Sequence, residues 1–172
     1  VRELRIAGVN IAGEMTLDGM PGEDLRFGVR PALEPLASIM DAALEAISPT
    51  EMRTIENRWL GASARRNRTP ATGPLTFSDA EQAWLADRNR QLTICVDPDW
   101  LPQEGLSEND KHLGISADIF ALFANRSNIT FTPLPVDSWS ESIEAVKNRH
   151  CDMLSMAMET PELLEYLSFT DP

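Results

Sequence analysis

The sequence predicts an α/β fold centred on a parallel three-stranded sheet with the order β-α-β-α-β. Apolar runs at 92–96, 129–136 and 152–158 have the length and composition of strands. The segments between them, 115–126 and 138–149, repeat apolar residues at helical spacing. Single-helix connections imply parallel strands with right-handed crossovers. In such sheets ligands gather beyond the carboxyl ends of the strands.

The N-terminal part of the chain predicts strands followed by two amphipathic helices. Segments 4–8 and 25–30 read as short strands on either side of a loop with Gly, Asp and Pro. Apolar residues over 33–47 recur at helical spacing, which predicts one buried helix face. A second helix is expected to begin at Ser48-Pro-Thr-Glu51, because Ser48 can cap it and Glu51 can reach back.

Composition changes abruptly at 61–74, where GASARRNRTPATGP has no periodicity and holds three arginines. This composition is typical of an interdomain connector. A capping box at Ser78-Asp-Ala-Glu81 then predicts another short helix. The domain prediction is therefore a first unit over 1–60, a linker over 61–75 and a second unit over 76–172.

Charge and composition exclude several classes of function. The net charge is −12, and the excess of acid is largest over 76–172, so a nucleic-acid partner is not expected. No run of about 18 apolar residues and no signal peptide is present, so any membrane contact is expected through segments outside this chain. Val1 is not an initiator Met, which suggests a piece of a longer precursor. Cys95 and Cys151 lie in or beside apolar strands and are expected to be buried thiols.

Four motifs occur in order: LTICVDPDWLP, GISADIFALFA, DSWSESIEAVKNRHCDML and METPELLEYLSFTDP. Together they resemble the opening half of a type II periplasmic solute-binding domain, or Venus flytrap, of the amino-acid-binding kind. LRFGVR and ISPTEMRTIENRWLG resemble the closing part of another copy. A closing part, a linker and an opening part are the arrangement of tandem flytrap sensors, as in the periplasmic region of BvgS-like sensor histidine kinases. In that family the chain crosses to the second lobe at FTDP.

The resemblance implies a periplasmic ligand-sensing region of a transmembrane signalling protein, whose kinase or cyclase output domain lies elsewhere in the precursor. Two alternatives stay open. One is a freestanding solute-binding protein of a transporter, and the other is an interaction or dimerisation scaffold whose cleft has lost its ligand. Catalytic residues, metal ligands and cofactors are not expected, because the two histidines and the strand-end acids assemble neither a catalytic constellation nor a metal site.

The expected partner is a small molecule at the carboxyl ends of the first and third strands. In amino-acid-binding members of this family, the turn after the third strand resembles Thr-Pro-Glu-Arg. The arginine of that turn makes a bidentate contact with the carboxylate of the ligand. This chain has Leu163 there, so binding of amino acids is not expected. Thr160 is expected to cap the turn at Pro161 and Glu162 in preference to binding a ligand. Trp100 can either pack its ring against a ligand or close the top of the sheet. The candidate ligand-binding residues are Asp99, Trp100, Met156, Met158, Glu159 and Thr160.

The flytrap resemblance implies an antiparallel strand, returning from the far end of the same domain, that covers the third parallel strand; without one, an apolar edge would stay open. We expect 25–30 to lie antiparallel beside 152–157, within one chain or across a homodimer that swaps this segment. The apolar stripes of the two N-terminal helices are then expected to pack on the sheet; they include Leu36, Met40, Leu44, Ile55 and Trp59.

Overall fold

A computed structural model describes residues 24–60 and 75–171. The predicted strand at 4–8 and the linker segment 61–74 lie outside the described residues. The helices are α1 (Glu34–Glu45), α2 (Pro49–Leu60), α3 (Asp79–Asp87), α4 (Ile115–Ser127), α5 (Trp139–Lys147) and the 3₁₀ turns η1 (Pro31–Leu33) and η2 (Leu163–Glu165). The strands are β1 (Leu25–Val29), β2 (Gln91–Cys95), β3 (Asp99–Trp100), β4 (Glu104–Leu106), β5 (His112–Leu113), β6 (Thr130–Pro133), β7 (Met153–Met158) and β8 (Ser168–Phe169).

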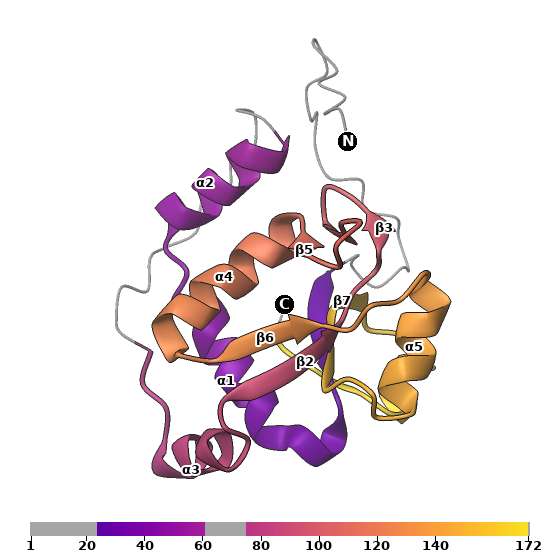
Figure 1. Cartoon of the computed structure of the whole chain (residues 1–172). Coiled ribbons are helices and arrows are strands. Elements are labelled where there is room, and N and C mark those ends of the chain that lie inside the picture. The colour runs from indigo at the N-terminus through magenta and orange to yellow at the C-terminus, as the bar shows by residue number, and fades with distance from the viewer. Residues whose placement is uncertain (1–23, 61–74, 172) are drawn as a thin grey trace, which may run out of the picture.

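The main sheet has five strands in the order β6-β2-β7-β1-β8 (Figure 1). Strand β2 pairs in parallel with both β6 and β7, so the predicted β-α-β-α-β core is confirmed. Strand β1 pairs antiparallel with β7, with Leu25 opposite Met158 and Val29 opposite Met153. The predicted pairing of the N-terminal strand is therefore confirmed, and the ladder forms within a single chain.

The ladder between β1 and β7 contains a bulge at Ser155 and Met156. Arg26 lies opposite Ala157 and Gly28 lies opposite Leu154, so two residues of β7, Ser155 and Met156, lie opposite the single residue Phe27 of β1. The extra residue reverses the alternation of side chains beyond it, and Ala157 consequently joins the same core as Leu154. The bulge sets which face the end of β7 presents at the edge of the sheet.

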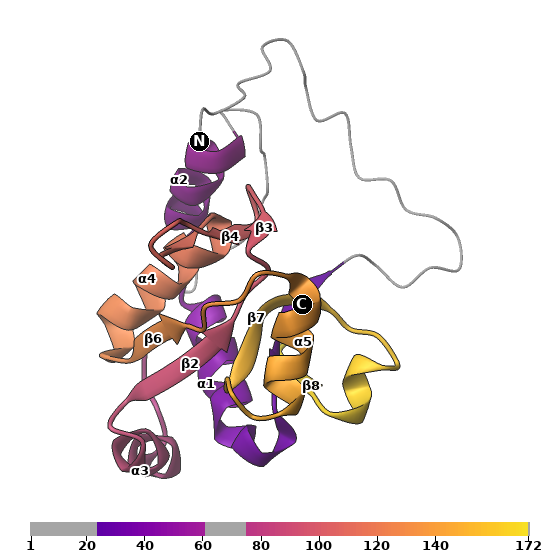
Figure 2. The same ribbon diagram turned by 45° about the vertical axis from the view of Figure 1, so that its right-hand side comes forward.

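The sheet is covered on both faces, as Figures 1 and 2 show. One core unites α1, α3 and α4 with β1 and β2, and its buried residues include Leu36, Met40, Leu85, Phe120 and Phe123. The other core lies under α5 and η2 and includes Ala145, Val146, Leu154, Leu163 and Leu167. The first core is much the larger, because the N-terminal helices add to it.

Helix α2 differs from the prediction that both N-terminal helices pack on the sheet. Leu36 and Met40 of α1 are fully buried there, whereas α2 packs on α4. Trp59 Nε1 donates a hydrogen bond of 2.8 Å to Asp118 near the start of α4, and Arg58 pairs with the same carboxylate at 2.7 Å. Helices α1 and α4 already cover this face of the sheet, so α2 cannot reach it. Ile55 and Trp59 of α2 instead extend the core over the outer side of α4.

The predicted helix starts are confirmed by their caps. The Glu51 carboxylate accepts from the Ser48 N–H at 3.0 Å, and the Ser48 hydroxyl accepts from the Glu51 N–H at 3.3 Å. Ser78 and Glu81 form the same reciprocal pair at α3. Each cap satisfies backbone donors that the first turn leaves free.

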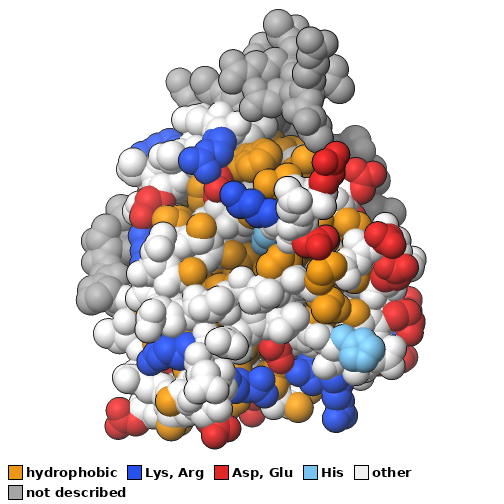
Figure 3. All heavy atoms as spheres, viewed as in Figure 1, with side chains coloured by type: hydrophobic (Ala, Val, Ile, Leu, Met, Phe, Trp, Pro, Cys, Tyr) orange, Lys and Arg blue, Asp and Glu red, His pale blue; other side chains and the backbone are white. Residues whose placement is uncertain are grey.

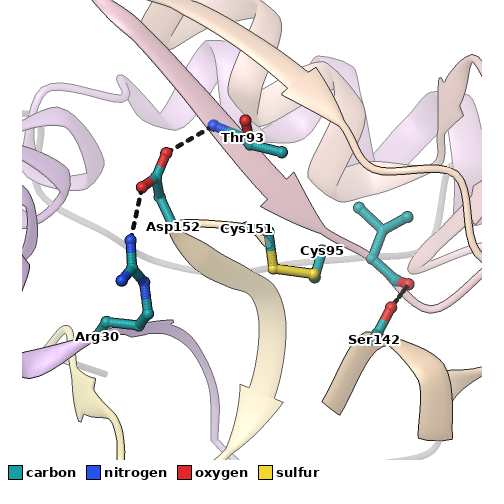
Figure 4. The surroundings of a disulfide bond; sticks show 7 residues. Arg30, Thr93, Cys95, Ser142, Cys151 and Asp152 are labelled. Atoms are coloured by element: carbon teal, nitrogen blue, oxygen red, sulfur yellow. Dashed lines mark hydrogen bonds and ion pairs between the residues drawn. A yellow bond between two sulfur atoms is a disulfide. The ribbon is translucent and has the colours of Figure 1, made fainter. Parts of the chain in front are cut away.

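Cys95 and Cys151 form a disulfide, which corrects the expectation of free buried thiols (Figure 4). Parallel pairing puts Ile94 beside Met153, and this brings the two cysteines to a Cα–Cα distance of 5.8 Å. The sequence separation of 56 hid a contact that only the pairing of β2 with β7 creates. The bridge is buried in the core under α5.

A second sheet, β3-β4-β5, was not predicted. Its strands are two or three residues long, which is too short for a periodic signal in the sequence. Gly114 joins β5 to α4 with φ of +103°, and a Cβ there would lie 2.6 Å from the Gln103 carbonyl oxygen. Only glycine permits this approach, which seats the start of α4 against β4.

Candidate ligand-binding edge

Strands β2 and β7 run in parallel, and two segments lie at their carboxyl ends: the loop 97–103 after β2 and the segment 156–160, which includes the end of β7 and the turn after it. We call these two segments the carboxyl edge. Parallel pairing of Cys95 with Leu154 puts both segments at one end of the sheet. The candidate ligand residues therefore lie at the expected place in the fold.

Asp99 and Trp100 project from the loop on strand β3. Both are exposed, and Trp100 retains 36% of its surface beside the exposed Leu101. The Asp97 carboxylate accepts from the Asp99 N–H at 3.1 Å, which shapes the start of the loop. Figure 3 shows hydrophobic side chains reaching the surface on this face of the molecule, with acidic side chains along the side that carries β3 and α5.

The four candidates from β7 and its turn differ in setting. Met156 is partly buried at the bulge, whereas Met158 is 49% exposed opposite Leu25. Glu159 pairs with Arg26 of β1 at 3.0 Å, and its side chain is 40% exposed. Arg26 is a charged group at this edge that sequence reasoning missed, because only the antiparallel ladder brings it there.

Thr160 caps the turn, as its preferred role predicts. Its Oγ1 accepts from the Leu163 N–H at 3.3 Å. The Leu163 side chain is 9% exposed and packs in the core with Leu154 and Leu167. This position thus points an apolar group into the protein and offers no cation to the carboxyl edge.

Glu104 is a fully buried carboxylate directly beneath the carboxyl edge. One oxygen, Oε1, accepts from the Asp97 N–H at 2.7 Å. The other, Oε2, accepts from the Ser155 hydroxyl of β7 and from the Ser116 hydroxyl of α4, the latter at 3.3 Å. One side chain therefore ties the ligand loop to the third strand and to the start of α4.

His112 extends this network toward the surface. Its Nε2 lies 2.8 Å from the Ser116 hydroxyl oxygen and 3.9 Å from Glu104 Oε2. Its side chain is 10% exposed, and its ring lies 5.8 Å from that of Phe120. Because Ser116 has one proton and donates it to the carboxylate, its oxygen accepts from His112, which puts the histidine proton on Nε2.

Burial perturbs both titratable groups of the network. Loss of solvation raises the pKa of Glu104 to about 7, against the lowering effect of its hydrogen bonds with Ser155, Asp97 and Ser116. The negative charge of Asp97 raises the pKa further. Burial lowers the pKa of His112 to about 4, so the imidazole is neutral at physiological pH. No cation pairs with Glu104 among the described residues.

Sequence reasoning missed this network for a physical reason. Glu104 was one acid among many, and only its complete burial distinguishes it. A signal was present in Ser155, a hydroxyl inside the apolar run of β7, since a buried hydroxyl needs a partner.

Within the described ranges, no three His, Cys, Asp or Glu side chains are grouped so that they could hold a metal ion. The same part of the chain contains no helix with the length and hydrophobicity of a membrane span.

Comparison with known proteins agrees with this geometry. Residues 92–172 match the family of bacterial extracellular solute-binding proteins, family 3. The chain is 30% identical over 148 residues to the virulence sensor protein BvgS of Bordetella pertussis, and 29% identical to that of Bordetella bronchiseptica. Each match covers 85% of this chain and 12% of the relative, so the chain spans about an eighth of their length.

Two solved structures have a similar fold. The crystal structure of the B. pertussis BvgS periplasmic domain matches with a TM-score of 0.52 at 29% identity, over 75% of this chain and 24% of that one. The BvgS periplasmic VFT2 domain matches with a TM-score of 0.51 at 26% identity, over 56% of this chain and 41% of that one. By sequence and by fold, this chain is related to the tandem Venus-flytrap solute-binding domains of BvgS-like periplasmic sensors.

Proposed function

We propose that this chain is an extracytoplasmic ligand-sensing region of a transmembrane signalling protein whose output domain, a kinase or cyclase, lies elsewhere in the precursor. Residues 1–60 close one flytrap domain, 61–75 link it to the next, and 76–172 form the first lobe of that next domain. The observation that carries the proposal is the match to a virulence sensor over 85% of the chain, across both units and the linker.

The buried disulfide supports an extracytoplasmic location. Disulfides persist in oxidising compartments such as the periplasm and are rare in the cytosol. Cys95 and Cys151 join two strands of the central sheet, so the bond forms part of the folded core. This observation is independent of the relatives.

Sensing proceeds by closure of two lobes about a hinge, which shifts a population between open and closed states. The chain leaves the described lobe beside β1, where Phe27 and Thr170 exchange two hydrogen bonds: the Thr170 hydroxyl accepts from the Phe27 N–H at 3.1 Å, and the Phe27 carbonyl accepts from the Thr170 N–H at 3.2 Å. The Asp171 N–H donates to Asp41 of α1 at 2.9 Å. The hinge is therefore anchored on β1 and α1.

The ligand contacts the carboxyl edge through Asp99, Trp100, Met156, Met158, Glu159 and Thr160. Its class is not the free α-amino acids, because Leu163 gives no bidentate contact to a carboxylate and Arg26 is already paired with Glu159. Calorimetry on the complete second flytrap domain should show weak or undetectable binding of amino acids. Micromolar binding of several amino acids would contradict this assignment of ligand class.

The sensing function is tested in the full-length precursor. Trp100→Ala removes an exposed aromatic from the carboxyl edge, and the sensor proposal predicts a changed output activity in membranes. Leu164→Ala is the matched control, since Leu164 is 50% exposed and outside the carboxyl edge. Unchanged output in Trp100→Ala would instead favour a scaffold, and a precursor without an output domain would favour a transport protein.

A homodimer that swaps residues 25–60 would preserve the same ladder between β1 and β7. Sedimentation velocity over a range of concentrations distinguishes it from a monomer with the intrachain pairing.

A further inference from the structure

We propose that Glu104 is the positioning residue of the ligand loop 97–103, and that gain or loss of its proton moves this loop and makes the carboxyl edge responsive to pH. The role at a ligand site rests on the proposed function. The proton-linked movement of the loop does not, since it follows from the buried network alone.

Glu104 joins three elements through its own hydrogen bonds. Its Oε1 holds the loop through the Asp97 N–H, and its Oε2 holds β7 and α4 through the hydroxyls of Ser155 and Ser116. The side chain has no exposed surface, so water does not replace a bond that is lost. Asp99 and Trp100 follow Asp97 after a single residue, Pro98, and the Asp99 N–H donates to the Asp97 carboxylate at 3.1 Å, so a movement of Asp97 is expected to carry both residues with it.

The groups that face Glu104 leave it free to titrate. The loop contributes the acid Asp97, β5 contributes the neutral His112, and α4 and β7 contribute only hydroxyls. An arginine or lysine partner would keep the carboxylate ionised, and none of the described hydrogen bonds or ion pairs of Glu104 involves one. Burial raises the pKa of Glu104 to about 7, within the range that a periplasmic protein meets.

Protonation reorganises the network in a defined order. A proton on Oε2 converts that oxygen from an acceptor of two hydroxyls into a donor, so a serine hydroxyl has to turn its own proton away. Ser116 has a new acceptor available in His112 Nε2, provided that the histidine proton moves to Nδ1. The bond from the Asp97 N–H loses its charge assistance, and charge-assisted bonds are about twice as strong as neutral ones. The loop is consequently held more tightly in the ionised state.

Nuclear magnetic resonance on the full 172-residue chain tests this directly. The amide proton of Asp97 should shift between pH 5.5 and 8.5 with a midpoint near 7, moving upfield as Glu104 takes up its proton, and Trp100 should report the same midpoint. Glu104→Gln should abolish both titrations. Asp99→Asn, an exposed acid in the same loop, should leave them unchanged.

A second variant keeps the inference testable if Glu104→Gln fails to fold. Ser155→Ala removes a donor to the ionised carboxylate and should move the Asp97 midpoint to higher pH. An Asp97 amide that does not titrate, a titration that persists in Glu104→Gln, or a Trp100 signal that stays fixed would each overturn the inference. A normal titration together with unchanged output in Trp100→Ala would reject the sensing function alone.

Discussion

Two carboxylates contact strand β7, and they are stabilised in opposite ways. Asp152 is partly buried, precedes the strand and accepts from Arg30 at 2.9 Å and from the Thr93 N–H at 2.9 Å (Figure 4). It also pairs with Arg88 at 3.4 Å. Glu104 is fully buried, contacts Ser155 in the middle of the strand and accepts only from uncharged donors. The same chemical group is thus a structural clamp before the strand and a titratable group beside its middle.

This difference indicates which part of the lobe is held rigidly and which part can change with ligand or pH. Two arginines and the disulfide fasten the amino end of β7 to β2 and to the turn after β1. At and beneath the carboxyl edge lie a small three-stranded sheet, exposed apolar side chains, and the Glu104 carboxylate, which pairs with no arginine or lysine among the described residues. Binding elements are expected at the less constrained end, because they are drawn from the parts of low local stability.

The largest expected effect is loss of the disulfide at the clamped end. The double variant Cys95→Ala, Cys151→Ala should lower the free energy of unfolding by about 4 kcal/mol, since the bridge closes a loop with a separation of 56 residues. Urea denaturation of the variant and of the oxidised and reduced wild type measures this. Equal stability of oxidised and reduced protein would contradict the clamp.

The second effect compares the two carboxylates directly. Asp152→Asn should lower the free energy of unfolding by about 3 kcal/mol, because it leaves the largely buried Arg30 without its counter-charge. Glu104→Gln should cost less at pH 8, since it removes a buried charge that has no cation. Denaturation at pH 8 measures both, with Asp99→Asn as the exposed control. A larger loss for Glu104→Gln than for Asp152→Asn would overturn the comparison.

The third effect is the pH dependence of stability. The pKa of Glu104 is raised from 4.5 to about 7 on folding, so its contribution to the free energy of unfolding is present below pH 4.5 and is lost as pH rises through 7. Glu104→Gln has no proton to lose at this position. Between pH 4.5 and 8, its free energy of unfolding should therefore rise by on the order of 3 kcal/mol relative to that of the wild type.

His112 should give stability a pH dependence of the opposite sign, which makes it a matched test. Its pKa is lowered from 6.5 to about 4 on folding, so its contribution is present above pH 6.5 and is lost as pH falls through 4. His112→Gln should lose stability relative to wild type as pH rises from 4 to 6.5. Thermal unfolding of the three proteins across this range distinguishes the two groups, and parallel curves would mean that neither titrates as described.

The smallest effect concerns the exposed pair at the carboxyl edge. Arg26→Met should change the free energy of unfolding by less than about 1 kcal/mol, because the Glu159 side chain is 40% exposed and the pair is screened by solvent. A double-mutant cycle with Glu159→Gln measures the coupling. A coupling of several kcal/mol would mean that this end is clamped as well.

The sequence by itself determined the succession of strands and helices along the chain, the parallel pairing of three strands, the helix starts and the position of the candidate ligand residues at strand ends. Those properties depend on local periodicity, on caps such as Ser48 with Glu51 and Ser78 with Glu81, and on motif order, which are all readable over a few neighbouring residues. The pairing of β1 with β7 was predicted from the resemblance to flytrap domains, in which an antiparallel strand covers this open edge.

Only the tertiary structure decided which polar residues meet. The disulfide joins positions that are 56 residues apart, Glu104 and Ser155 are 51 apart, and Arg26 and Glu159 are 133 apart. Helix α2 packs on α4 instead of the sheet because α1 and α4 had already covered that face. Burial, which raises the pKa of Glu104 and lowers that of His112, is a property of the assembled layers and leaves no mark on the local sequence around either residue.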